Sequence, residues 1–212
     1  MSAPHVIVLH GLFCSSRIMK RLMNYLSKAG FKVIGLSYPS RTRLLPEIAK
    51  MVAKQITLLS DPKEQIHFVA HSMGGIVVRQ LFRDYPEIQK RIGRVVMLGT
   101  PNQGCEMAEV ALRIPLGKKI GGKNLTFFSL HNSPLTDFPL PPETGIIAGT
   151  VSANPFSSLI FNEPNDGVVG VEKTKARGMK DWKALPVTHQ GLLKEEKVFQ
   201  QVVSFLREGK FE

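Results

Sequence analysis

The sequence predicts a domain of the α/β class, a mostly parallel sheet of about six strands with helices on both faces. Short apolar runs alternate along the chain with longer stretches in which apolar residues recur at helical spacing. Connections of helical length between strands are the crossovers that parallel pairing requires. The chain has 212 residues, of which 43% are hydrophobic, enough for one sizeable core. We therefore expect residues 1–212 to form a single domain.

Two local patterns justify the individual elements. Residues 6–9 form a continuous and largely β-branched run, which is typical of a buried strand. Residues 17–29 repeat apolar side chains at helical spacing, and Gly30 follows as a stop signal. By the same two patterns, further strands are expected at residues 31–36, 65–70, 94–98, 145–149 and 182–187, and further helices at residues 44–59, 74–82 and 192–206.

Two of these helices have an expected apolar side. In the helix at residues 44–59, the side chains that repeat on one side are Ile48, Met51, Val52, Gln55 and Leu59. In the closing helix, the candidate inward positions are Leu193, Val198, Val202 and Phe205.

The alternation of strands and helices breaks over residues 102–142. This stretch mixes glycines with scattered basic residues and ends in a proline-rich segment. A long and weakly periodic insertion in a compact domain is more often functional than accidental.

Charge and cysteine content exclude some classes of protein. The chain carries 28 Lys and Arg against 17 Asp and Glu, a net charge of +11 that permits attraction to anionic surfaces. Its two cysteines, Cys14 and Cys105, are too few for a disulfide framework or a zinc site, and we interpret both as small buried residues. The N-terminus lacks the features of a secretory leader, and no apolar stretch has the length of a membrane span. We expect a cytoplasmic protein with both thiols free.

The segment Ala70-His71-Ser72-Met73-Gly74 has the residue pattern of a turn that exposes a nucleophile. A serine hydroxyl is a poor nucleophile unless a tight turn exposes it beside a base. A strand that runs straight into a helix makes such a turn, and the helix N-terminus adds positive charge where negative charge will develop. Small residues two positions on either side prevent collisions across the turn. Because this pattern lies between an expected strand and an expected helix, it predicts a nucleophilic Ser72; the alternative is an ordinary turn serine.

Five segments, in this order along the chain, resemble the α/β-hydrolase superfamily, most closely its small bacterial lipases and esterases. They are residues 10–13 (HGLF), 70–75 (AHSMGG), 98–104 (LGTPNQG), 165–169 (NDGVV) and 186–189 (PVTH). The sequence departs from the family at Ala70, where glycine is usual, and it lacks antiparallel strands before residue 6. The resemblance implies a minimal α/β-hydrolase fold with a short cap formed by residues 102–142.

The family order of Ser, then Asp or Glu, then His assigns the acid and the base. His189 follows the last expected strand, and Asp166 matches the family's acid position, from which it would orient the His189 ring. His131 is a rival base, and Asp137 and Glu163 are weaker alternatives for the acid.

The other histidines have expected structural roles. The resemblance gives His10 a role in supporting the loop after the first strand. The His71 side chain should point away from the serine turn. His5 and His67, at and within strands, are expected to be structural.

The resemblance also implies an oxyanion hole made of two backbone N–H groups. One belongs to Met73, directly after the nucleophile, and the other to Leu12, with Phe13 as a near alternative.

The substrate pocket is expected to be apolar. Phe13, Phe127 and Phe128 are the candidate substrate-binding residues, and an apolar wall would favour medium acyl chains over acetate. Further candidates for this wall are Ile114, Leu116, Leu159, Ile160, Phe156 and Phe161. The alternative is that these side chains only anchor surface loops.

Two basic stretches accompany these motifs. The first contains Arg113, Lys118, Lys119 and Lys123, and the second contains Lys173, Lys175, Arg177, Lys180 and Lys183. These residues either form a solvated face or attract acidic substrates. They could also bind anionic membrane surfaces weakly. No nucleic-acid-binding motif accompanies them, so no nucleic-acid partner is expected. The sequence shows no metal-ligand cluster, so neither a catalytic metal nor another cofactor is expected; a structural calcium ion is the remaining alternative.

Three hypotheses for the function follow. The first is a serine hydrolase that cleaves carboxylic esters, including lipid esters, through an acyl-enzyme. The second is an acyltransferase with the same triad, which the partition of products with an added alcohol would separate from the first. The third is a non-catalytic binding module, against which the intact set Ser72, Asp166 and His189 argues.

Overall fold

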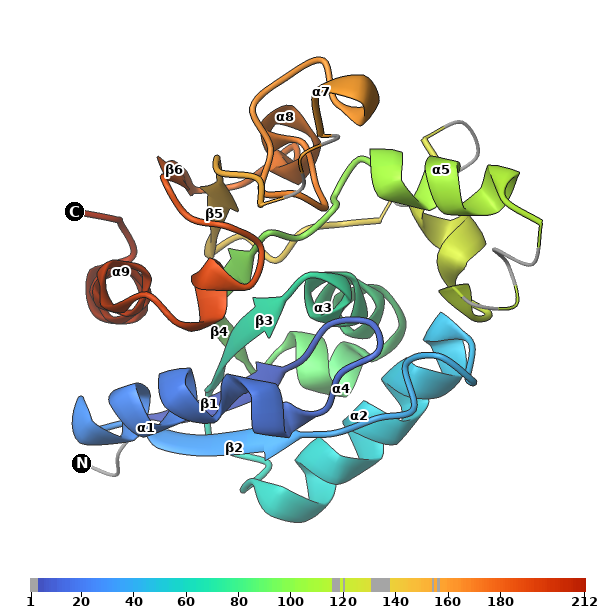
Figure 1. The fold of residues 1–212 in the computed structure, drawn as a ribbon. Coiled ribbons are helices and arrows are strands. Elements are labelled where there is room, and N and C mark those ends of the chain that lie inside the picture. Colours follow the sequence, from blue (N-terminus) through green and yellow to red (C-terminus); the bar gives the residue numbers. More distant parts are fainter. Residues whose placement is uncertain (1–3, 116–118, 120, 131–137, 154, 156) are drawn as a thin grey trace.

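A six-stranded parallel sheet forms the centre of the protein (Figure 1). The computed structural model describes residues 4–115, 119, 121–130, 138–153, 155 and 157–212. In chain order the strands are β1 (His5–Leu9), β2 (Lys32–Leu36), β3 (Ile66–His71), β4 (Ile92–Leu98), β5 (Thr144–Gly149) and β6 (Asp181–Leu185). They lie in the order β2-β1-β3-β4-β5-β6, and each neighbouring pair is parallel. The expected fold class is confirmed.

Helices fill the crossovers between these strands. The longer ones are α1 (Lys20–Lys28), α2 (Leu45–Leu59), α3 (Met73–Asp84), α5 (Glu106–Arg113) and α9 (Glu196–Glu208). The shorter ones are α4 (Pro86–Gln89), α7 (Ser157–Ile160) and α8 (Val171–Thr174), with the 3-10 turns η1 (Ser16–Met19), η2 (Leu125–Phe128) and η4 (Gly191–Leu193).

The inner strands β1, β3 and β5 are buried on both faces, as near-continuous hydrophobic runs require in a parallel sheet. In β1, Ile7 and Leu9 belong to the core cluster that includes α2 and α3, whereas Val6 and Val8 belong to the cluster that includes α1 and α9. Figure 1 shows the resulting layers, with α1 and α9 at the left and α2 and α3 on the other side of the sheet. Successive side chains of one strand therefore anchor opposite helical layers.

Three expectations about helices need correction. In α2, Met51 and Leu59 are exposed (37% and 51%), and the buried side is instead Leu45, Ile48, Ala49, Val52, Ala53 and Ile56. The expected closing helix is divided into η4 and α9, although its four candidate inward residues are all buried. Finally, α5 lies within residues 102–142, where no regular element was expected, because a helix of only eight residues is too short to establish a clear period.

The register of the sheet gathers the strand ends at one edge. Leu9 is paired with Ala70, and His71 is paired with Leu98, the last residue of β4. Leu98 is in turn paired with Ile147 in β5. Segments that leave the carboxyl ends of these strands must therefore begin close together, although they are distant in sequence. In an open parallel sheet this edge is the usual place for a site.

No helix in the described part of the chain is both long enough and apolar enough to cross a membrane.

Replacing Gly74 by alanine tests the close contact between α3 and β1. A Cβ atom at Gly74 would lie 2.6 Å from the Leu9 carbonyl oxygen and 3.0 Å from that of His10. Because these carbonyl oxygens belong to the backbone, they cannot rotate away from the added Cβ atom. Gly74→Ala should therefore lower the free energy of unfolding by about 1–3 kcal/mol. Urea denaturation measures this, with the exposed Ser27→Ala on α1 as the control, expected to change stability by less than about 0.5 kcal/mol. Equal stability of the two variants would show that the contact is not tight.

Candidate active site

Ser72 stands on a strained turn between β3 and α3. It is the single residue between the two elements, and its φ of 53° and ψ of −124° lie in a region that side chains rarely adopt. Such a conformation costs about 1–3 kcal/mol and persists only where the surroundings enforce it. Here the Ser72 N–H donates to the Leu98 carbonyl at 2.9 Å, and the Thr100 hydroxyl donates to the Ser72 carbonyl at 3.1 Å. Neighbouring strand β4 and the loop that follows it thus hold the turn.

Asp166 and His189, which are far apart in sequence, are in direct contact. The His189 Nδ1 atom lies 2.7 Å from Asp166 Oδ2, and the His189 backbone N–H donates to the Asp166 carbonyl at 2.8 Å. The other carboxylate oxygen, Oδ1, accepts the N–H groups of Val168 at 2.9 Å and Val169 at 2.8 Å. Since a carboxylate accepts, His189 donates from Nδ1, and in the neutral form of the ring Nε2 is the nitrogen without a proton. This is the arrangement that a histidine base needs.

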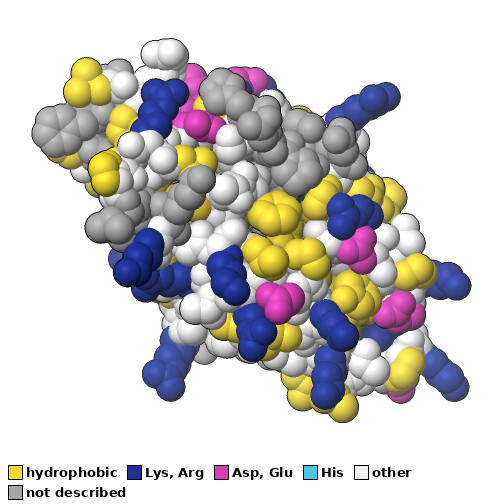
Figure 2. Space-filling model, turned by 90° about the vertical axis from the view of Figure 1, so that its right-hand side faces the viewer, with side chains coloured by type: hydrophobic (Ala, Val, Ile, Leu, Met, Phe, Trp, Pro, Cys, Tyr) yellow, Lys and Arg dark blue, Asp and Glu magenta, His cyan; other side chains and the backbone are white. Residues whose placement is uncertain are grey.

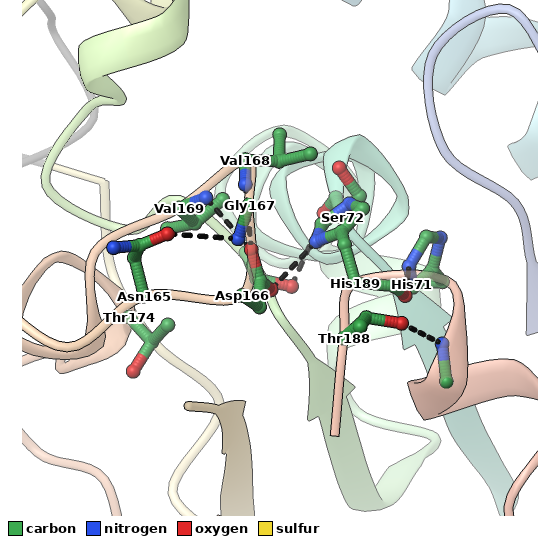
Figure 3. Close-up of polar contacts among 12 residues, drawn as sticks. His71, Ser72, Asn165, Asp166, Gly167, Val168, Val169, Thr174, Thr188 and His189 are labelled. Atoms are coloured by element: carbon green, nitrogen blue, oxygen red, sulfur yellow. Dashed lines mark hydrogen bonds and ion pairs between the residues drawn. The ribbon is translucent and has the colours of Figure 1, made fainter. Parts of the chain in front are cut away.

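His189 and Ser72 line the same cavity. Figure 3 shows the His189 ring between the Asp166 carboxylate and Ser72. Among the described residues, no hydrogen bond joins the Ser72 hydroxyl to the His189 ring. Such contacts are often long without substrate and tighten only in the reactive complex.

His71 packs against His189, a contact that we did not expect. The two ring centroids are 4.5 Å apart, and His71 Nε2 lies 3.1 Å from the backbone oxygen of His189. Because a carbonyl only accepts, His71 donates from Nε2, and its buried Nδ1 has no partner among the described residues. Burial, together with the nearby His189, holds the pKa of His71 well below its usual value. His71 therefore stays neutral and supports the loop that carries His189.

The loop after β1 is held by His10, as expected. The His10 ring donates from Nδ1 to the Gly11 carbonyl at 2.7 Å and accepts the Tyr38 N–H on Nε2 at 3.2 Å. Tyr38 stacks on this ring at 4.1 Å and donates its hydroxyl proton to the His10 carbonyl. Burial lowers the pKa of His10, consistent with a neutral ring that both donates and accepts. The sequence indicated Tyr38 only as the end of a strand, so its role here was missed.

This loop presents backbone N–H groups beside Ser72. A Cβ atom at Gly11 would lie 3.0 Å from Ser72 Cβ, so the loop and the serine turn are in close contact. The N–H of Phe13 is taken by the Ser40 hydroxyl at 3.1 Å. Within the described residues, the N–H groups of Leu12 and Met73 have no hydrogen-bond acceptor. Leu12 is thus better suited than Phe13 as the second donor to a substrate oxygen.

Phe13 itself is strained and exposed. Its φ is 62°. Among the described residues, Phe13 and Ser72 are the non-glycine residues with a positive φ. Its side chain is 57% exposed and lines the cavity that contains Ser72. Nothing in the sequence indicated this backbone conformation.

The cavity has a volume of about 400 Å³ and is mostly apolar. Phe13, Phe128 and Ile114 line it as expected, together with Met107, Ala108, Ala111, Leu125 and Cys105. Phe127 is not part of the lining, so its expected place there is wrong. Its partly buried side chain packs against the core cluster that includes α2 and α3. Leu159 and Ile160 also lie outside the lining; Leu159 is 82% exposed, and Phe161 is buried elsewhere.

Some candidate residues lie outside the described part of the chain. They are Leu116, Lys118, His131, Asp137 and Phe156. The remaining alternative acid is Glu163, which accepts the Glu172 N–H at 2.8 Å, whereas the carboxylate bonded to His189 is that of Asp166.

The two cysteines differ in their surroundings. Cys105 is buried, donates its thiol proton to the Val168 carbonyl at 2.9 Å, and has a pKa that burial raises to about 12. Cys14 is partly exposed, so the expectation that it is buried is wrong. Both thiols are free in the structure.

The segment after β4 fixes the region that follows Asp166. Buried Asn102 donates from its side chain to the Thr174 carbonyl at 2.7 Å and accepts from Arg79 at 3.0 Å. The Gln103 N–H donates to the Lys173 carbonyl at 3.0 Å. These bonds connect the matching segments 98–104 and 165–169 through α8. Within the described residues, no group of three or more His, Cys, Asp or Glu could hold a metal ion.

Comparisons with known proteins agree with this architecture. A sequence model described as the alpha/beta hydrolase fold matches residues 4–119. No curated protein matches the sequence significantly.

Several solved structures are similar. A lipase from Bacillus licheniformis in its mature form has a TM-score of 0.73 at 15% identity, over 98% of this chain and 92% of that one. A metagenomic carboxyl esterase has a TM-score of 0.72 at 18% identity, over 89% and 65% of the two chains. A phospholipase from Legionella pneumophila has a TM-score of 0.68 at 18% identity, over 82% of this chain and 45% of that one. At these identities the likeness establishes a shared fold.

Because it contains buried histidines, the protein should have a lower free energy of unfolding in acid. Burial lowers the pKa values of His10, His67 and His71 in the folded protein, so the unfolded chain binds more protons once the pH falls below about 6.5. This stability is therefore present above about pH 6.5 and is lost as the pH falls through the lowered folded-state values.

The variant His71→Gln should reduce the slope of unfolding free energy against pH in this acidic range. One proton fewer is taken up on unfolding, which corresponds to about 1.4 kcal/mol per pH unit. Urea denaturation between about pH 6.5 and about pH 5 measures the slope. The same slope in both proteins would mean that His71 is protonated in the fold.

Proposed function

The chain belongs to the alpha/beta hydrolase family, and on that premise we propose that it is a serine hydrolase of carboxylic esters. The nucleophile would be Ser72, the base His189 and the orienting acid Asp166. The observation that carries the proposal is the 2.7 Å contact between buried Asp166 and the ring of His189, in a cavity that a strained Ser72 also lines.

The first step is attack on the ester carbonyl carbon. The Ser72 Oγ atom forms a bond to this carbon while its proton moves to Nε2 of His189. The π bond of the carbonyl breaks, and its electron pair goes to the oxygen, which becomes negative. Asp166 stabilises the imidazolium that forms, since its carboxylate already accepts the Nδ1 proton.

The negative oxygen then needs donors that do not have to reorganise. The unpaired N–H groups of Leu12 and Met73 supply them, and the N-terminus of α3 adds the positive end of a helix dipole. Each donor of this kind is worth about 2.7–4 kcal/mol of barrier stabilisation.

Collapse of the tetrahedral intermediate breaks the bond to the alcohol. The alcohol oxygen takes the proton from His189 and leaves, and the acyl group stays on Ser72 as an ester. Water then attacks this ester while His189 takes one of its protons. The bond to Ser72 Oγ breaks, the carboxylic acid is released, and His189 returns the proton to Ser72. No cofactor enters this cycle.

The lining of the cavity supports an apolar acyl group. Helix α5 and turn η2 contribute Met107, Ala108, Ala111 and Phe128, so we propose that residues 102–142 act as a cap over the acyl chain. A lipase, a carboxyl esterase and a phospholipase share the fold, which fits an ester substrate with a hydrocarbon part.

The proposal predicts that Ser72→Ala and His189→Ala each lower kcat on a p-nitrophenyl ester by a factor on the order of 10⁶. The double variant should be little worse than either one, because the two groups act in one step. Asp166→Asn should lower kcat by about 10⁴, because an amide favours the wrong tautomer of His189.

Steady-state rates and circular dichroism of each variant give the measurement and the control for folding. Wild-type rates in either single alanine variant would overturn the assignment of the nucleophile or the base.

The cavity also predicts a preference for acyl length. Ala108→Leu adds three carbons to the lining, so kcat/KM for a p-nitrophenyl octanoate should fall about 10- to 100-fold, as expected for methylene-sized changes in an apolar pocket. The acetate ester should keep its rate, because its acyl group does not reach this wall. An equal change on both esters would place the acyl chain elsewhere.

A further inference from the structure

A second cavity, of about 490 Å³, adjoins the one that contains Ser72. Its lining includes three cationic residues, Arg41, Lys119 and Lys123, and two hydroxyl residues, Thr42 and Thr126. We refer to these five residues as the basic groove. Leu125 lines both cavities, so the basic groove lies next to the candidate active site.

The three cations of the basic groove form no ion pair with any carboxylate of the described residues. In the second basic stretch, by contrast, Lys175 pairs with Glu172 at 2.7 Å and Lys180 with Glu143 at 2.6 Å. The positive charge of the basic groove is therefore not neutralised by a carboxylate, and it lies beside the catalytic cavity.

One acidic side chain does interact with the groove. Glu47 lies within electrostatic range of Lys123. Its oxygens already accept the Leu44 N–H at 2.9 Å and an Arg43 N–H at 3.2 Å. Glu47 thus neutralises Arg43 and leaves the charge of the groove largely uncompensated.

Buried contacts hold the two walls of the basic groove together. The side-chain amide of Asn124, which is fully buried, donates to the Ser40 carbonyl at 3.0 Å and to the Arg43 carbonyl at 2.7 Å. The Lys123 N–H donates to the Arg41 carbonyl at 3.1 Å. The backbone positions of Arg41 and Lys123 are therefore fixed relative to each other.

The same walls are joined to the oxyanion loop. Ser40, which accepts the Phe13 N–H, precedes Arg41 directly, and the Arg41 guanidinium lies 6.0 Å from the centre of the Phe13 ring. Phe13 lines the catalytic cavity. A ligand in the groove would thus be adjacent to the donors that face the substrate oxygen.

We propose that the basic groove binds the phosphate of an ester substrate whose alcohol is itself a phosphate monoester, such as an acylated glycerol phosphate. A phosphate monoester carries about 1.5–2 negative charges near pH 7 and three strong acceptor oxygens, which three cations and two hydroxyls match better than a single carboxylate would. The proposal rests on the proposed function, because the acyl chain is placed in the catalytic cavity.

Figure 2 shows the face of the molecule that lies at the right of Figure 1, where α5 and the start of α2 are found. Dark-blue Lys and Arg side chains surround yellow hydrophobic side chains on this face, and magenta carboxylates are fewer. An anionic substrate would be attracted along such a surface, more strongly at low ionic strength.

The test compares two substrates that differ only in the phosphate. These are 1-octanoylglycerol 3-phosphate and 1-octanoylglycerol, each used as monomers in solution, with release of octanoate as the readout. We expect kcat/KM to be about 10-fold higher for the phosphate ester at low salt, and this preference to fall as NaCl screens the charges.

Matched variants locate the effect. Lys119→Gln with Lys123→Gln should remove most of the preference for the phosphate ester and leave kcat/KM for the neutral ester within about twofold. Lys28→Gln with Lys210→Gln removes the same charge from exposed positions near the amino edge of the sheet and should keep the preference. Equal preference in both double variants would show a general effect of net charge and overturn the subsite.

A binding measurement separates this inference from the proposed function. Calorimetric titration of glycerol 3-phosphate into the Ser72→Ala variant should show binding that the Lys119→Gln, Lys123→Gln pair weakens, with inorganic phosphate binding more weakly than glycerol 3-phosphate. Hydrolysis of the neutral ester without any phosphate preference or binding would overturn the subsite and leave the hydrolase. Binding without hydrolysis of either ester would overturn the hydrolase and, with it, the assignment of the groove to a substrate.

Discussion

The close contact of β1, β3 and α3 around Ser72 is the constraint on which the rest of the structure depends. Gly74 lets α3 approach the carbonyl of Leu9, and Gly11 lets the loop after β1 approach Ser72. The strained φ of Ser72 is sustained because β4 and Thr100 hold its backbone on the other side. Without these contacts the serine would relax into an ordinary turn, and Leu12, Ser72 and Met73 would no longer line one cavity. The strained backbone of Ser72 lowers the stability of the fold, and the same conformation places its hydroxyl in the cavity that His189 also lines.

Much of this arrangement could be predicted from the sequence because its signals are local or follow chain order. The strand-turn-helix pattern identified the turn at Ser72, and the family resemblance selected Asp166 and His189, which the structure brings into contact. Features that depend on distant packing were not predictable. The support of His189 by His71, the conformation of Phe13 and the outward position of Met51 arise from contacts between segments far apart in sequence. Phe127 and Phe128 are adjacent in sequence, yet only Phe128 faces the cavity, because a 3-10 turn directs neighbouring side chains apart.

The distribution of charge on the folded surface also could not be predicted from the sequence. Both basic stretches look alike in the sequence, and only the fold distinguishes them, since Glu172 and Glu143 pair with two lysines of the second stretch. The first contributes Lys119 and Lys123 to a groove that Arg41, from a separate loop, completes. Asn124 makes this juxtaposition possible through bonds to the loop that contains Arg41. A net charge of +11 is therefore less informative than the places where carboxylates are missing.

We propose that Ser72 is an activated nucleophile, and covalent labelling tests this without knowledge of the natural ester. A fluorophosphonate probe should react with the protein, and digestion followed by mass spectrometry should find the phosphonyl group on Ser72 alone. The Ser72→Ala protein should not be labelled, and His189→Ala should be labelled far more slowly, because the base that takes the serine proton is gone. Labelling at another residue would contradict the assignment of Ser72 as the nucleophile, and equal labelling of the wild-type and His189→Ala proteins would contradict its activation by His189.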